Sequence, residues 1–324
     1  MKEVFITDTT LREGLQSAIG EMTIEQRKDL FYDILNLNVK EIELGVPAHS
    51  KEERQFIKSL IDEGFQDKII TWNRANIKDI EYSLECGAKL LEISFPISDI
   101  MIYKKLGKDR KYIFDIAKNI ISSCKEKSVY ISCGLEDATR ADFSFIEEFV
   151  HLLKALGVDR IRYSDTLGVG NPIKVYEDIS ILSKILPVEV HLHNDFGMAT
   201  ANAVSAIMAG ATYINTTLLG LGERVGITPL EEISLYTEFV LGYKTNINVS
   251  NITILVKKLT NMLNIDIHPN KPIYGANAFI NKSSIHIKAQ QKSKDIYLPF
   301  DPTAIGLSEQ FCFGYFSKAK NEQT

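Results

Sequence analysis

The fold depends on two short runs of sequence, Glu189-Val190-His191-Leu192-His193 and Tyr213-Ile214-Asn215-Thr216-Thr217. Six similar apolar or β-branched runs precede them, at residues 4–7, 41–44, 69–72, 91–95, 129–133 and 160–164, and a stretch with helical spacing follows each run. Such alternation predicts parallel βα units. A doubly wound open sheet would have the same pattern up to its sixth strand. The two quoted runs bring the number of strands to eight, which predicts an α/β fold with a closed (β/α)8 TIM barrel.

Local signals place helices between these strands. Thr23 and Gln26 have the spacing of a capping box, and Asn171-Pro172 puts proline at the first position of a later helix. The alternation ends near residue 265, and the proline-containing segment 267–272 leads into irregular sequence. We therefore predict a barrel over residues 1–265 and a short C-terminal subdomain over residues 266–324. Because about 60 residues make a weak independent core, we expect the subdomain to dock on its own barrel, on a partner subunit or on both.

The composition excludes several classes of protein. Hydrophobic residues make up 45% of the chain, which is enough to stabilise a folded core, so a disordered protein is excluded. The 37 Lys and Arg against 42 Asp and Glu give a net charge of −5, which argues against nucleic acid as a partner. No apolar run approaches the roughly 18 residues of a membrane span, and the first residues are no signal peptide. We expect free thiols in the cytoplasm, because no Cys-x-x-Cys occurs among Cys86, Cys124, Cys133 and Cys312.

His191 and His193 stand at the end of the seventh predicted strand. Side chains two positions apart on a strand point to the same face, so both imidazoles can bind one ion. The first and last strands of a closed barrel are neighbours, so the loop at residues 8–16 reaches the same end. Glu13 in that loop would complete a set of two histidines and one carboxylate, which leaves positions open for substrate on a divalent metal. The alternatives are a hydrogen-bonded pair of core histidines and a solvated ion pair between Arg12 and Glu13.

Further polar residues follow other predicted strands, where parallel barrels gather functional side chains. Asn73 and Arg74 follow the third strand, Glu136 follows the fifth and Thr166 follows the sixth. Each of them could contact a substrate, cap a helix or support another side chain. The glycine-rich run at residues 219–228 follows the eighth strand, so it either binds an anion or only closes the barrel. Its position and spacing argue against a dinucleotide-binding motif.

Three separated motifs together resemble one enzyme family. They are Thr9-Thr10-Leu11-Arg12-Glu13-Gly14, His191-Leu192-His193-Asn194-Asp195 and Gly220-Leu221-Gly222-Glu223-Arg224. The chain is similar in them to the homocitrate, isopropylmalate and citramalate synthases, the DRE-TIM metallolyases, and the likeness runs from residue 3 to residue 306. Residues 71–74, 96–99 and 134–142 most resemble the homocitrate synthases that serve the nitrogenase cofactor in nitrogen fixation. Residues 217–230 instead resemble the homocitrate synthases of lysine biosynthesis.

The resemblance implies a metal-dependent Claisen condensation with acetyl-CoA as co-substrate. Glu13, His191 and His193 would bind Mg2+, Mn2+ or Zn2+, and the metal would chelate the carboxylate and ketone oxygens of a 2-oxo acid. Arg12 would stabilise the alkoxide that forms when the acetyl-CoA enolate attacks the ketone.

The other site residues also follow from the resemblance. His286 lies in a segment similar to the second-domain histidine motif of the family, and it would act in the acid–base chemistry of a partner's barrel. The resemblance therefore implies a homodimer with an active site shared between the subunits. Glu136 is the third expected catalytic residue. The expected substrate-binding residues are Gln16, Thr166, Asn73 and Arg74.

Several positions differ from the family pattern. Lysine-pathway relatives bind the distal carboxylate with basic residues after the third and fifth strands, where this chain has Trp72 and Ser132. For 2-oxoglutarate, Arg74 or a loop residue would have to replace that contact. Residues 313–318 stand where relatives have a basic turn, and Ser284 replaces a glycine. No regulatory domain follows, so feedback inhibition of the leucine type is not expected.

The sequence thus predicts a cytoplasmic acyltransferase that condenses acetyl-CoA with a 2-oxo acid, with 2-oxoglutarate and homocitrate as the first choice. Synthesis of citramalate, isopropylmalate or (R)-type citrate is the alternative within the family. A carbon–carbon lyase is a further alternative, although none of the four cysteines lies in a glycine-rich loop like that of the related lyases. The altered C-terminal end also leaves a non-catalytic homologue open.

Overall fold

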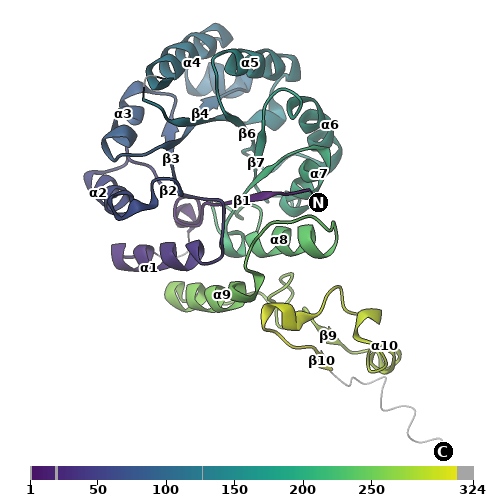
Figure 1. Ribbon diagram of the computed structural model, residues 1–324. Coiled ribbons are helices and arrows are strands. Elements are labelled where there is room, and N and C mark those ends of the chain that lie inside the picture. Colours follow the sequence, from purple (N-terminus) through teal and green to yellow (C-terminus); the bar gives the residue numbers. More distant parts are fainter. Residues whose placement is uncertain (1, 19–20, 126, 312–324) are drawn as a thin grey trace, which may run out of the picture. The chain divides into compact units, whose positions relative to one another are not determined.

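The computed structural model describes residues 2–18, 21–125 and 127–311. In this part of the chain, strands β1 to β8 pair in parallel and in sequence order, and β8 closes the barrel against β1 (Figure 1). The predicted TIM barrel and its eight predicted strands are therefore confirmed. The strands are β1 (Phe5–Asp8), β2 (Glu41–Gly45), β3 (Ile69–Arg74), β4 (Leu90–Pro96), β5 (Tyr130–Glu136), β6 (Arg160–Asp165), β7 (Val188–Leu192) and β8 (Tyr213–Thr216).

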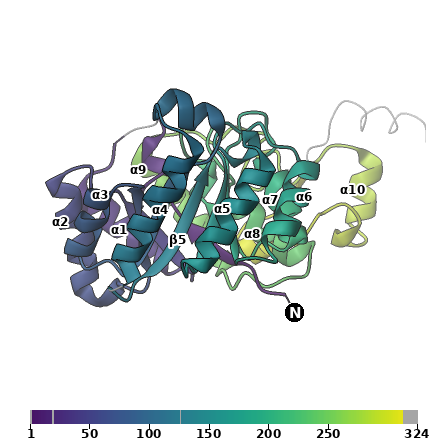
Figure 2. The same cartoon turned by 90° about the horizontal axis from the view of Figure 1, so that it is seen from above.

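Helices surround the strands, and Figure 2 shows β5 running between two of them, α4 and α5. Thr23 and Gln26 form the predicted capping box at the start of α1, and Asn171 caps α6 with Pro172 as its first residue. These caps satisfy amide groups that the first turn of a helix leaves without an intrahelical acceptor. The helices are α1 (Ile24–Leu35), α2 (Lys51–Leu60), α3 (Ile77–Glu85), α4 (Arg110–Lys125), α5 (Phe143–Ala155), α6 (Pro172–Leu182), α7 (Ala199–Ala209) and α8 (Leu230–Phe239).

The barrel interior carries charged side chains where many parallel barrels carry branched apolar ones. Side chains along β6 alternate in direction, and Tyr163 faces outward, where its hydroxyl donates to Asp178 of α6 at 2.6 Å. Arg160 faces inward and is fully buried. Its Nη2 lies 2.8 Å from a carboxylate oxygen of Glu41, and its Nε lies 3.1 Å from one of Glu189. Each guanidinium in the interior is thus paired, which offsets the cost of removing it from water.

The described residues form two compact units, which divide between Ile247 and Asn248. The second unit contains α9 (Val249–Leu263), whose Thr253 hydroxyl donates to the carbonyl oxygen of Ile305 and lies 3.0 Å from the hydroxyl of Tyr274. These contacts join α9 to the C-terminal segment, so the units separate before this helix, whereas the boundary predicted at 265/266 follows it. The other elements of the unit include β9 (Ile280–Asn281), α10 (Ser284–Gln290) and β10 (Gln310–Phe311), and β9 and β10 pair in parallel.

Three of the four cysteines lie in the described part of the chain. Cys86, Cys124 and Cys133 are free and buried, and burial raises the pKa of each thiol. Cys312 and the segment 313–318 lie outside the described residues. Among the described helices, none has the length and apolar character needed to cross a membrane.

Candidate active site

Glu13, His191 and His193 come together at the C-terminal end of the barrel. Glu13 precedes the short helix η1 (Gly14–Gln16) that follows β1, and the two histidines lie at the end of β7. One ligand atom from each residue lies within 4.8 Å of the other two, and the two Nε2 atoms are 3.3 Å apart. His191 Nδ1 lies 2.7 Å from the side-chain oxygen of Asn215. An amide oxygen only accepts, so Nδ1 carries the proton and the Nε2 lone pair of His191 faces its neighbours.

The three side chains are buried, and their environment controls their charge. Burial alone would raise the pKa of Glu13, but Arg12, the two histidines and the amide of Glu223 outweigh it and lower the pKa. Burial lowers the pKa of His191, and burial together with His191 lowers the pKa of His193 to about 4. At neutral pH the cluster therefore consists of one carboxylate and two neutral imidazoles.

This cluster fits a divalent metal. Metals bind deprotonated imidazole nitrogens and carboxylate oxygens, and such a set leaves coordination positions open for substrate. His193 Nδ1 is buried and has no hydrogen-bond partner among the described residues, which is unusual for a buried polar atom. This donor set is compatible with Mg2+, Mn2+ and Zn2+.

Arg12 lies beside this cluster and is held from two sides. Its Nη1 donates to a carboxylate oxygen of Glu13, and its Nε donates to Glu43 Oε1 at 2.6 Å. Thr9 Oγ1 donates to the same Glu43 oxygen at 2.9 Å. Burial would raise the pKa of Glu43, but Arg12 and Arg162 outweigh it and lower this pKa to about 2. Glu43 is therefore ionised, and it fixes the Arg12 guanidinium next to the position expected for the metal.

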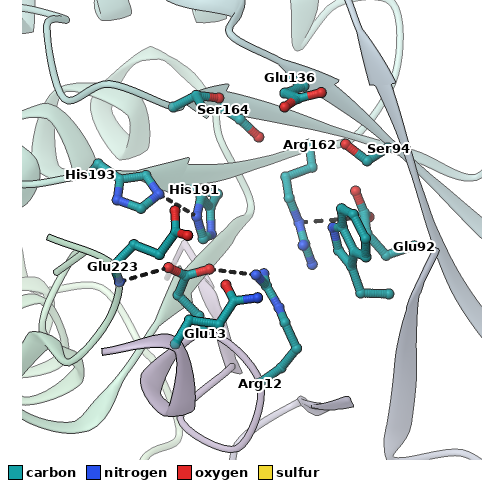
Figure 3. A pocket seen from close by; sticks show the side chains of 13 residues that line it. Arg12, Glu13, Glu92, Ser94, Glu136, Arg162, Ser164, His191, His193 and Glu223 are labelled. Atoms are coloured by element: carbon teal, nitrogen blue, oxygen red, sulfur yellow. Dashed lines mark hydrogen bonds and ion pairs between the residues drawn. The ribbon is translucent and has the colours of Figure 1, made fainter. Parts of the chain in front are cut away.

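These residues line a cavity of about 190 Å³ at the mouth of the barrel (Figure 3). Seven of the predicted site residues meet there, which supports the expectation that functional side chains gather at this end of a parallel barrel. They are Arg12, Glu13, Gln16, Glu136, Thr166, His191 and His193. Glu136 also pairs with Lys105 at 2.6 Å, and Thr166 Oγ1 accepts a hydrogen bond from the amide of Asp137 at 2.8 Å.

Three predicted site residues do not line this cavity. Asn73 is buried outside it, and its amide nitrogen donates to the carbonyl oxygens of Thr71 and Glu92 at 3.0 and 3.1 Å. The Arg74 side chain is 65% exposed and makes two hydrogen bonds to Asp79, at 2.7 and 2.9 Å. His286 belongs to the second unit, where it stacks on Tyr297 with ring centroids 4.1 Å apart.

The structure adds residues that the sequence-based prediction missed. A weak signal existed for one of them, Arg162, because Glu41 and Glu43 are two positions apart on β2, as Arg160 and Arg162 are on β6. Charges at this spacing share one strand face, and two such strands would predict a charged barrel interior. The missed residues that line the cavity are Trp72, Glu92, Ser94, Arg162, Ser164 and Glu223.

The glycine-rich run at residues 219–228 contacts Glu13, one of the three candidate metal ligands, directly. The backbone amide of Glu223 donates to Glu13 Oε1 at 3.1 Å, so the run helps to position the carboxylate of Glu13. Gly226 has a φ of +88°, and a Cβ atom at this position would lie 1.7 Å from the carbonyl oxygen of Gly220. Only glycine fits such a close approach of two backbone segments.

Residues 3–258 match the model of the HMGL-like family. The chain is 36% identical to 2-isopropylmalate synthase 2 of Caldanaerobacter subterraneus subsp. tengcongensis, over 98% of this chain and 83% of that protein. It is 35% identical to homocitrate synthase 1 of Nostoc sp., over 98% of this chain and 85% of that protein. These matches confirm the family resemblance that the three sequence motifs predicted.

A solved structure of similar fold is the HMG-CoA lyase from Bacillus subtilis. It superposes with a TM-score of 0.74 at 19% sequence identity, over 82% of this chain and 96% of that chain. At this level of identity the match concerns the barrel fold alone.

Proposed function

Because the chain belongs to the HMGL-like family, we propose that it condenses acetyl-CoA with a 2-oxo acid, with 2-oxoglutarate as the first choice and homocitrate as its product. The chain is an acyltransferase of this family. The observation that carries the proposal is the convergence of Glu13, His191 and His193 beside the fixed guanidinium of Arg12 in one cavity. The balanced reaction consumes acetyl-CoA, the 2-oxo acid and water, and it releases free CoA and a 2-hydroxy acid.

Glu13, His191 and His193 would hold a divalent metal, which supplies Lewis-acid polarisation of the 2-oxo group when it is bound. The Arg12 guanidinium donates hydrogen bonds to the ketone oxygen as the carbonyl carbon is attacked and the oxygen gains negative charge. Because Glu13 and Glu43 already hold Arg12 in place, little reorganisation is needed when that charge develops.

Glu136 and His286 supply the acid–base steps in this proposal. One of these two groups acts as the base and removes a proton from the methyl group of acetyl-CoA. The resulting enolate carbon then forms a bond to the carbonyl carbon of the 2-oxo acid. The alkoxide then gains a proton. Water attacks the thioester, the carbon–sulfur bond breaks, and CoA leaves as a thiol. The Glu136 carboxyl group lines the same cavity as Arg12, which suits a group that acts at the reacting carbon.

Release of free CoA tests this function. The purified chain is supplied with Mg2+, Mn2+ or Zn2+ and acetyl-CoA, and thiol release is followed with 2-oxoglutarate, oxaloacetate, pyruvate or 2-oxoisovalerate in separate reactions. We expect metal-dependent thiol release with 2-oxoglutarate as the best acceptor. A better rate with another acceptor would indicate citramalate, isopropylmalate or (R)-type citrate synthesis. The absence of thiol release with all four acids would contradict the proposal.

The two remaining alternatives make different predictions. A carbon–carbon lyase would cleave a CoA thioester without any added 2-oxo acid. A non-catalytic homologue would be unaffected by His286→Ala in every measurable activity and binding assay, whereas the proposed enzyme would lose most of its turnover.

The acyltransferase proposal includes a homodimer in the cytoplasm, with His286 of one subunit acting in the barrel of the other. Mixing two inactive variants tests this arrangement. In a mixed dimer of an Arg12→Gln subunit and a His286→Ala subunit, one of the two shared sites contains both intact residues and the other contains neither. Half of all randomly formed dimers are mixed, so the mixture would recover about a quarter of the wild-type rate. If His286 served its own barrel, the mixture would contain no intact site and would stay inactive.

A further inference from the structure

We propose that Arg162 binds the second carboxylate of a dicarboxylic 2-oxo acid, and that it thereby selects this substrate class. The inference rests on the proposed function in that the 2-oxo group of the same molecule would lie at Glu13, His191 and His193. Arg162 lines the cavity together with these three residues, and Figure 3 shows it between His191 and Glu92.

One N–H group of the Arg162 guanidinium, at Nε, has no hydrogen-bond partner among the described residues. Its Nη1 lies 2.5 Å from Glu43 Oε2, and its Nη2 lies 3.3 Å from Glu189 Oε1. Its Nε lies 3.6 Å from Glu92 Oε2, too far for a hydrogen bond, and has no hydrogen-bond partner among the described residues. A buried charged donor without a partner is costly, so this edge is suited to an incoming carboxylate oxygen.

Small residues leave space beside this edge. Ser94 of β4 and Ser164 of β6 line the cavity one inward position beyond Glu92 and Arg162. Gly134 lies between these strands on β5, and a Cβ atom there would lie only 2.5 Å from Glu92 Oε1. Glycine at position 134 therefore makes room for the Glu92 carboxyl group, and the two serines leave the cavity wall beside Arg162 without long side chains at their positions. A ligand that extends from Glu13, His191 and His193 toward this wall would contact Arg162.

The charge of Glu92 is compatible with an anionic ligand. Burial and the charges of Glu189 and Glu43 outweigh the effect of Arg162 and raise the pKa of Glu92 to about 7. Neither carboxyl oxygen of Glu92 has a hydrogen-bond partner among the described residues. When it is protonated, this carboxyl can donate a hydrogen bond to a substrate carboxylate, while Arg162 supplies the positive charge.

Arg74 is the other candidate for this contact, on the basis of the sequence. Its guanidinium already makes two hydrogen bonds to Asp79, and the side chain is largely exposed to solvent. Trp72, two residues earlier on β3, lines the cavity instead. The buried Arg162, with one N–H group that lacks a hydrogen-bond partner among the described residues, therefore suits the contact better than the exposed Arg74, which is already paired with Asp79.

Ligand binding can be measured without turnover, because Trp72 is the single tryptophan of the chain and lines the cavity. Its fluorescence is followed while 2-oxoglutarate or 2-oxopentanoate is added in the presence of Mg2+. The two acids have five carbons each and differ in one end group, a carboxylate or a methyl group. We expect 2-oxoglutarate to bind at least about tenfold more tightly, the value of one charge-assisted hydrogen bond. Equal affinities, or tighter binding of 2-oxopentanoate, would overturn the inference.

Arginine variants assign the preference to a residue. Arg162→Lys keeps the charge but loses the flat fork of donors, and we expect it to remove the preference for 2-oxoglutarate. Arg160→Lys is the matched control, because Arg160 is equally buried, pairs with Glu41 and Glu189, and does not line the cavity. It should keep the preference. Loss of the preference in Arg74→Gln, with Arg162→Lys unaffected, would assign the contact to Arg74 and contradict the proposal.

A second pair of variants avoids changing the buried ion pairs. Ser94→Asp places a negative charge at the proposed carboxylate position, whereas Ser94→Asn has nearly the same size and no charge. We expect Ser94→Asp to weaken 2-oxoglutarate binding at least about tenfold relative to Ser94→Asn, and to leave 2-oxopentanoate binding within about threefold. Equal effects on both acids would count against the inference. These binding outcomes are separate from thiol release, since a chain without any turnover could still show the preference.

Discussion

The two sides of the cavity carry different buried ionisable side chains and suit ligands of opposite charge. On the side of β1 and β7, one carboxylate and two neutral imidazoles present lone pairs that suit a cation. On the side of β4 to β6, Arg162 presents an N–H edge that lacks a hydrogen-bond partner among the described residues, next to a carboxyl group with a raised pKa. Burial thus favours the neutral form of His193 on one side and of Glu92 on the other.

Glu43 connects the two sides. One of its oxygens accepts from Arg12 at 2.6 Å, and the other lies 2.5 Å from Arg162. Its pKa of about 2 keeps it ionised between the two guanidinium groups. A single buried ion-pair network thus orients both Arg12, beside the candidate metal site, and Arg162, on the opposite wall.

The largest effect is expected on the metal side. Glu13→Gln keeps the size of the side chain but removes the charged oxygen ligand, so we expect the metal Kd to rise at least about 100-fold and turnover to fall by a similar factor or more. Calorimetric titration with Mn2+ and the thiol-release assay measure the two effects. Glu25→Gln, an exposed carboxylate in the first turn of α1, is the matched control and should change neither value. Unchanged metal affinity in Glu13→Gln would show that these three residues are not the metal ligands.

An intermediate effect is expected for Arg12, which borders both sides. In Arg12→Lys, a single ammonium group cannot span Glu13 and Glu43 as the guanidinium does, so we expect kcat to fall about 100-fold. The metal Kd should change much less, because all three ligands remain. Parallel measurement of kcat and of the metal Kd checks this separation. A large loss of metal affinity with a small loss of kcat would mean that Arg12 only positions Glu13.

The smallest effect is expected on stability, through Glu92. Its pKa of about 7 in the folded chain exceeds the ordinary value of 4.5, so the folded state holds the proton more tightly. As pH rises from 4.5 to about 7, the unfolded state loses this proton first, and the free energy of unfolding falls by about 1–3 kcal/mol. Glu92→Gln cannot lose the proton, so relative to wild type it should be more stable at pH 8 than at pH 5.

Urea unfolding at the two pH values measures this difference. Glu81→Gln, an exposed position on α3, serves as the control and should show the same difference from wild type at both pH values. A pH-independent effect of Glu92→Gln would indicate that Glu92 is ionised in the folded chain, next to Arg162.

The barrel, its strands and the candidate metal cluster could be predicted from the sequence, because the signals for them are local. The period-two and helical patterns act over a few residues, and His191 and His193 share a strand face in any parallel sheet. The prediction of Glu13 needed one further step of reasoning, because a closed barrel must bring its first strand beside its last one.

The contacts within the cavity wall opposite the candidate metal site were decided by the tertiary structure. Glu41 and Arg160 are 119 residues apart in the sequence and meet only because the closed barrel directs both side chains to its axis. The same closure gives Arg162 three carboxylate neighbours, whereas the local sequence placed Arg74 first as the candidate for the distal carboxylate. Contacts across the barrel determine whether a charged side chain is exposed, paired or left with an N–H group that lacks a hydrogen-bond partner. No pattern of neighbouring residues contains that information.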